Sequence, residues 1–85
     1  MDLSLDRIPV GSKCKILKLL SSGIEHRRFL DLGFIKNTEV EVLYNSPFDD
    51  PVAYFIRGTT IALRNSDAKK VIVRPSIKRR DIYAK

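Results

Sequence analysis

Few residues of this chain belong to the types that carry out chemistry, and they lie far apart in the sequence. There is one cysteine, Cys14, one histidine, His26, and one pair of adjacent carboxylates, Asp49 and Asp50. Each could ligate a metal ion, but ferrous iron favours sites in which imidazole or thiolate joins oxygen ligands. Because these groups are isolated from one another, we predict no metal site and no resident cofactor.

The same residues have plain structural roles. Cys14 stands on the apolar side of an alternating segment, where a free cysteine usually behaves as a small buried hydrophobe. His26 stands beside two arginines on the polar side of a predicted helix, so we expect a solvated imidazole. The carboxylates lie among turn formers, where Asx turns are common. With no Ser–His–acid set and no glycine-rich phosphate loop, the sequence predicts a protein that is not an enzyme.

The composition predicts one small globular domain in a reducing, cytoplasmic setting. The chain has 85 residues, 44% of them hydrophobic, and its one cysteine leaves no internal disulfide. Its longest uninterrupted apolar run, Val52 to Ile56, is too short to span a bilayer. The first ten residues contain two aspartates and no apolar core segment, so we expect no secretory signal.

The net charge of +6 is concentrated at the C-terminus. Residues 1–73 hold 11 basic and 9 acidic side chains, whereas residues 74–85 hold 5 basic and 1 acidic. A nucleic-acid interface needs basic side chains gathered on folded structure. We therefore divide the chain into a folded domain, residues 1–74, and a basic, mobile tail, residues 75–85, and we expect no DNA binding.

The N-terminal half predicts a strand followed by a short helix. Residues 13–19 alternate as a half-buried strand does, and the alternation breaks at Leu17, which indicates a bulge or the strand end. Ser22 and Glu25 have the spacing of a capping box, so a helix should begin there and run over about 23–32. Gly33 fits a left-handed cap, with Phe34 closing over Phe29.

The second half predicts a long-looped hairpin and two further strands. Residues 38–44 alternate, with Val40, Val42 and Tyr44 expected inward. Residues 45–51 are dense in turn formers and predict a loop before a strand over 52–57. If Tyr44 pairs with Val52, then Glu39 faces Arg57, which would be a favourable cross-strand pair. The remaining predicted elements are a strand over 60–63, a helical turn over 65–69 capped by Asn65 or Ser66, and a strand over 71–73.

These elements predict a mainly β fold with one helix: a small, partly open barrel of about five strands. Such a barrel covers most of its own strand edges. We expect the helix to pack its apolar side chains on the sheet. The expected contacts are Phe29, Leu30 and Leu32 against Val40, Val42 and Ile56.

Several short motifs, read in order, resemble the FeoA family of small cytoplasmic proteins of bacterial ferrous iron transport. They are Leu5…Pro9-Val-Gly11, Leu30-Asp-Leu-Gly33, Thr38-Glu-Val-Glu-Val42, Pro47-Phe-Asp-Asp-Pro51, Gly58-Thr-Thr-Ile-Ala-Leu-Arg64, Ala68 and Val71-Ile-Val73. The resemblance implies an SH3-like β-barrel with a helical insertion. The chain departs from the family pattern at Lys36-Asn37, where the family usually has Pro-Gly, and at Asp49, where it usually has glycine.

The resemblance also implies a function: a cytoplasmic accessory that docks on the membrane transporter FeoB, so that iron is involved only through the transport system. The expected contact residues are the outward-facing Leu43 and Phe55, Phe48 at a loop tip, and Leu30 and Asp31 near the helix end. We expect a monomer or a weak oligomer.

Two other functions stay open at this point. Small barrels can bind RNA, and Arg57 and Arg64 could flank Tyr54 or Phe55 for this purpose. The FeoA-like domain also forms the C-terminal module of metal-dependent repressors of the DtxR type, which would make this chain a regulatory domain. No helix-turn-helix precedes the domain here, so the free-standing form is the better match.

Overall fold

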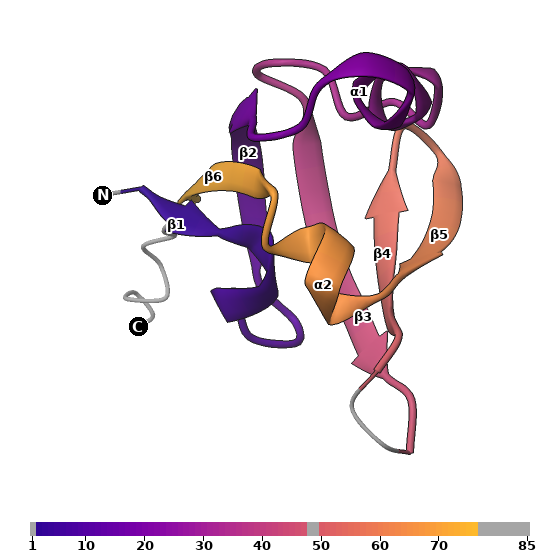
Figure 1. Cartoon of the computed structure of the whole chain (residues 1–85). Coiled ribbons are helices and arrows are strands. Elements are labelled where there is room, and N and C mark those ends of the chain that lie inside the picture. Colours follow the sequence, from indigo (N-terminus) through magenta and orange to yellow (C-terminus); the bar gives the residue numbers. More distant parts are fainter. Residues whose placement is uncertain (1, 48–49, 77–85) are drawn as a thin grey trace.

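The computed structural model describes residues 2–47 and 50–76, which fold into one antiparallel sheet with two α-helices and a 3₁₀-helix (Figure 1). The elements in chain order are β1 (Leu3–Ser4), η1 (Leu5–Arg7), β2 (Lys13–Leu19), α1 (Gly23–Asp31), β3 (Glu39–Asn45), β4 (Val52–Ile56), β5 (Thr59–Leu63), α2 (Asn65–Ala68) and β6 (Val71–Pro75). All five predicted strands, the helix and the helical turn are present.

The sheet has the strand order β1-β6-β2-β3-β4-β5 and is open, so β1 and β5 are its edges. The sequence analysis missed β1, which has only two residues and exists because it pairs with β6. A strand this short carries no alternating pattern of its own. In Figure 1 the sheet curves around the core, α1 lies over the end where β4 finishes, and the start of β4 lies at the opposite end.

The core is built from the inward side chains of the strands together with residues of η1 and α1. The largest fully buried side chains are Tyr54, Phe34, Leu5, Ile16, Ile56, Val40, Val42, Val71, Val73 and Cys14. Burial of these apolar groups stabilises the fold by roughly 1.5–3 kcal/mol for each large aliphatic side chain. The prediction that Cys14 is a buried structural residue is confirmed.

The end of α1 matches the predicted Schellman motif. The Phe34 N–H donates to the Phe29 carbonyl and the Gly33 N–H to that of Leu30, each at 3.0 Å. Gly33 adopts φ +105°, a conformation that side-chain-bearing residues rarely adopt. The Phe29 and Phe34 rings meet edge to face, with centroids 5.7 Å apart, and this apolar contact closes the motif.

The start of α1 differs from the prediction. Ser22 is the N-cap residue, but its side chain makes no capping hydrogen bond. The Glu25 carboxylate instead accepts from the Lys70 ammonium at 2.6 Å, across 45 residues of sequence. The capping box is therefore wrong, because a cation brought close by the fold is a stronger partner for a carboxylate than the local backbone N–H.

A β-bulge changes the register of the β3–β4 hairpin part of the way along. Val40 faces Ile56 and Val42 faces Tyr54, in the predicted register, but beyond Leu43 the pairing shifts by one residue. Tyr44 is consequently 60% exposed, and its predicted inward orientation is wrong. One extra residue in a strand reverses which face the following side chains occupy.

The predicted pairing of Glu39 with Arg57 is also wrong, because the β4–β5 turn begins one residue earlier than expected. Arg57 and Gly58 form this turn, with φ angles of +50° and +81°. Glu39 faces Lys15 of β2 in the ladder. At the other end of β5, the N-cap residue of α2 is Arg64, so the predicted cap by Asn65 or Ser66 is wrong. The backbone N–H of Asn65 donates to the Asp50 carboxylate at 2.9 Å, which supplies a partner from a distant part of the chain.

Two of the helix residues expected in the core are not there. Phe29 is buried, but Leu30 and Leu32 are exposed. Phe29 is the only buried residue of α1, so the helix contacts the barrel along a narrow stripe. No helix in the described part of the chain has the length and apolar character needed to cross a membrane.

Candidate functional site

The predicted contact residues lie at opposite ends of the molecule. Leu30 and Asp31 are exposed on α1, and Phe55, 41% exposed, stands near the end of β4 that α1 covers. Leu43 is half-buried at the bulge in β3, toward the other end. Phe48 lies outside the described residues. The structure therefore brings Leu30, Asp31 and Phe55 to the same end of the barrel and leaves Leu43 away from them.

Exposed apolar side chains are concentrated on α1 and the segments that flank it. This helix surface comprises Leu20, Ile24, Leu30, Leu32 and Ile35, which are five of the eight large exposed hydrophobic residues described. Ile24 is 83% exposed and was missed by the sequence analysis. Phe29, which is buried, follows Ile24 by five positions, a spacing that places the two side chains on nearly opposite sides of a helix and could have revealed the exposure of Ile24.

Two contacts outside the hydrophobic core hold α1 in place. The Glu25–Lys70 ion pair joins its first turn to the segment before β6, and both side chains are about two-fifths exposed, so it adds roughly 0.2–1 kcal/mol. At the other end, Gly33 packs under the Arg57 side chain. A Cβ built on Gly33 would lie 2.8 Å from the Arg57 Cδ, so the Arg57 side chain would have to move to admit a larger residue.

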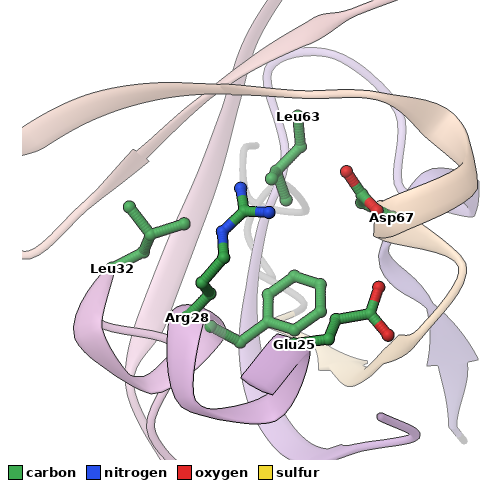
Figure 2. A pocket seen from close by; sticks show the side chains of 6 residues that line it. Glu25, Arg28, Leu32, Leu63 and Asp67 are labelled. Carbon is green, nitrogen blue, oxygen red and sulfur yellow. The ribbon is translucent and has the colours of Figure 1, made fainter. Parts of the chain in front are cut away.

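Figure 2 shows the pocket between α1 and the β5–α2 segment. Arg28 extends from α1 toward Leu63, and the carboxylates of Glu25 and Asp67 lie on one side of it. The cavity measures about 20 Å³, which is room for one or two water molecules. It is therefore a packing defect under α1 and too small for a substrate.

A larger and shallower hollow surrounds Phe55 on the outer face of the sheet. It measures about 310 Å³, and its rim is formed by Lys13, Thr38, Glu39, Glu41 and Arg57. Phe55 faces Glu41 in the ladder, and Glu41 in turn faces Lys13. An exposed aromatic ring within a rim of both charges is a typical anchor for a protein contact.

Cys14 and His26 each have local contacts in the structure. Burial, with a smaller contribution from the nearby Glu39 carboxylate, raises the pKa of the Cys14 thiol to about 12. The Cys14 S–H points at the Val40 carbonyl, 3.7 Å away. The half-buried His26 has its Nδ1 3.5 Å from the Ser21 hydroxyl. Across residues 2–47 and 50–76, no three of the histidine, cysteine and acidic side chains gather as metal ligands would.

Known proteins resemble this chain in sequence and in structure. A family model described as the FeoA domain matches residues 3–75. A fusion of Fe(2+) transport protein A with the Fe(2+) transporter FeoB, from Porphyromonas gingivalis, is 30% identical over 71 residues, which is 84% of this chain. The chain spans 8% of the length of that protein.

Solved structures share the fold. An FeoA-like protein from Clostridium acetobutylicum superimposes with a TM-score of 0.84 at 27% identity, covering 92% of this chain and 91% of that one. The zinc complex of Stenotrophomonas maltophilia FeoA, described as a prokaryotic SH3 domain protein, gives a TM-score of 0.74 at 28% identity, with 84% and 88% coverage. The predicted SH3-like fold is confirmed.

A manganese-dependent transcriptional repressor shows the same fold at lower identity. It superimposes with a TM-score of 0.78 at 17% identity over 88% of this chain and 42% of that one. This degree of identity supports a shared architecture, and a shared fold does not by itself carry a function.

Proposed function

Since the chain belongs to the FeoA family of ferrous iron transport, we propose that it is a non-enzymatic accessory protein that docks on a FeoB-type transporter and modulates iron uptake. The observation that carries the proposal is the Porphyromonas gingivalis relative, in which the homologous segment and FeoB form one polypeptide. Two proteins joined in one relative commonly act together where they are separate. We place this association at the cytoplasmic side of the membrane.

The helix surface supports this docking. Ile24 and Leu30 project from a short helix that is anchored by Phe29, so a partner can cover them without disturbing the core. Protein contacts draw most of their free energy from a few such anchors. Because the domain is small, we expect a transient contact below the standard interface size of roughly 1,600 Å².

Binding to the purified transporter in detergent tests the proposal. Immobilised FeoB-type transporter from the same host is titrated with wild-type protein and with Ile24→Asp and Leu30→Asp. Each variant places a charge in the apolar contact, so we expect binding to weaken at least about tenfold, equivalent to about 1.4 kcal/mol. In the same assay, Phe55→Ser tests whether the hollow around Phe55 also contacts the transporter.

Tyr44→Asp is the matched control, because the exposure of Tyr44, 60%, lies between those of Leu30 and Ile24, and Tyr44 stands toward the far end of β3. Circular dichroism confirms that each variant folds. Absence of wild-type binding would refute the docking proposal itself. Full affinity of Ile24→Asp and Leu30→Asp would instead refute the choice of surface.

A further inference from the structure

Strand β5 is the longer of the two edges of the sheet, and its outer side has no partner among the described strands (Figure 1). β1, at the other edge, has two residues, whereas β5 has five. Natural sheets protect an edge by keeping its strand short or by placing charged residues or proline on it. The β5 sequence Thr59-Thr-Ile-Ala-Leu63 contains neither, so this edge is open to pairing with another strand.

The turn before β5 determines which of its backbone groups face outward. Arg57 and Gly58 adopt φ angles of +50° and +81°, as the central residues of a type I′ turn do. Such a turn closes with a hydrogen bond to its fourth residue, so Thr59 directs its backbone groups toward β4. Hydrogen-bonded pairs alternate along an antiparallel ladder, and the β4–β5 register is regular. The N–H and C=O groups of Thr60 and Ala62 therefore point away from β4, at exposed positions.

The strand is complementary to a second copy of itself. If two copies run antiparallel with Ile61 facing Ile61, then Thr60 of each copy faces Ala62 of the other, and the outward groups of both residues find partners. A shift by one residue would set these groups against residues whose own groups face β4. A shift by two would leave one of them facing Gly58 or Arg64, which lie beyond the ends of the strand.

The side chains agree with this register. Ile61 is half-buried and packs against the core, so pairing with its counterpart would remove more of its apolar surface from water. Thr60 and Ala62 are small, and no charged side chain on the strand opposes the approach. Just outside the strand, Arg64 faces Gly58 of the other copy, so two cations do not face each other directly. The strand therefore suits a second copy without any need for complementary charge.

We propose that β5 pairs with β5 of a second copy of this chain, joining the two sheets about a two-fold axis at Ile61. This isologous contact covers the exposed edge of both copies and closes the assembly as a dimer. Two short strands bury much less than the standard interface of roughly 1,600 Å², so we expect a dissociation constant on the order of 0.1–1 mM. The contact uses no residue of the helix surface, so it is independent of the proposed docking on the transporter.

Sedimentation equilibrium and nuclear magnetic resonance of the full chain test the dimer without the transporter. As the concentration rises to about 1 mM, the average mass should rise toward that of a dimer. The amide shifts of Thr60, Ala62 and their neighbours should change over the same range. A constant monomer mass, or shift changes centred on Ile24 and Leu30 of the helix surface, would overturn the proposal.

Two double variants test the register at the same exposed positions. Thr60→Glu with Ala62→Lys sets opposite charges face to face across the two-fold axis, whereas Thr60→Lys with Ala62→Lys sets like charges face to face. We expect the first to associate about tenfold more tightly than the second. Circular dichroism confirms that both fold. Equal association of the two would contradict the proposed pairing.

Crosslinking provides a second measure of the register. Facing residues of a non-hydrogen-bonded antiparallel pair have Cα atoms about 4.5 Å apart, a distance that a disulfide can span. Under mild oxidation Ile61→Cys should therefore form a covalent dimer. Thr59→Cys, exposed on the same strand, is the matched control, because Thr59 faces Leu63 of the other copy. Equal crosslinking of both variants would also refute the register.

Discussion

The thiol of Cys14 is completely buried in the core, facing the Val40 carbonyl, and its pKa is raised from 9.0 to about 12. The folded state therefore favours the protonated thiol more than the unfolded state does. The stability that this provides is fully present below about pH 9 and is lost as the pH rises toward about 12. At neutral pH the thiol should be inert, because the thiolate is the reactive form.

This shift predicts a pH dependence that Cys14→Ala should lack. Between about pH 8 and about pH 10.5, the unfolding free energy of the wild type should fall by on the order of 2 kcal/mol more than that of Cys14→Ala. Urea unfolding of both proteins across this range measures the difference. Parallel curves for the two proteins would show that burial does not shift the thiol pKa.

At the scale of single residues, the sequence predicted the burial of Cys14 but not the ion-pair partner of Glu25. The alternation of residues 13–19 was enough to place Cys14 inside. The partner of Glu25 could not be found in the same way, because Lys70 comes close only through the fold. The hollow that Tyr54 lines has no sequence signal, because its lining residues come from parts of the chain that are far apart in the sequence.

At the scale of elements, α1 depends on one buried side chain. Phe29→Ala should cost about 3–5 kcal/mol, since it removes a buried aromatic ring and its contact with Phe34. Leu30→Ala, at an exposed neighbouring position, should cost less than about 1 kcal/mol. Chemical denaturation of the two variants measures this difference. Equal losses would mean that α1 packs along a broader face than its burial indicates.

The strands and the helix were predicted, but details that depend on pairing between distant residues were not. Gly33 and Phe34 define the end of α1 within a few residues, so the sequence was sufficient there. The bulge at Leu43 has no such local cause, and it reversed the expected orientation of Tyr44. The same limit explains why Leu30 and Leu32 are exposed although the sequence predicted that they would be buried. Apolar residues in a helix form a buried face only when another element covers them.

On the scale of the whole molecule, the helix surface is separate from the polar hollow lined by Asp6, Asn45 and Tyr54. Helix α1, which carries the helix surface, lies at one end of the sheet (Figure 1), whereas the residues that line the hollow belong to η1, the turn after it, β3, β4 and α2. The sequence indicated part of the helix surface through Leu30. It could not indicate the hollow, because its walls meet only in the folded chain.

The distribution of charge leads to a prediction that separates transport from nucleic-acid binding. Residues 77–85, outside the described part, hold 4 of the 16 basic side chains and 1 of the 10 acidic ones. Each phosphate contact contributes a slope of about −0.7 to the salt dependence of binding to single-stranded RNA. If any RNA affinity resides in this tail, a chain ending at Ser76 should lose it and keep its affinity for the transporter, because the helix surface is intact.

Filter binding to single-stranded RNA at several salt concentrations, beside the transporter titration, measures both affinities for the full and the shortened chain. A shortened chain with unchanged, salt-sensitive RNA binding would place an interface on the folded domain, where Arg57 and Arg64 could flank the exposed Phe55. It would then favour an RNA-binding barrel over an accessory of iron transport. Loss of transporter binding on shortening would instead assign the docking to the basic tail, since nothing on the helix surface changes.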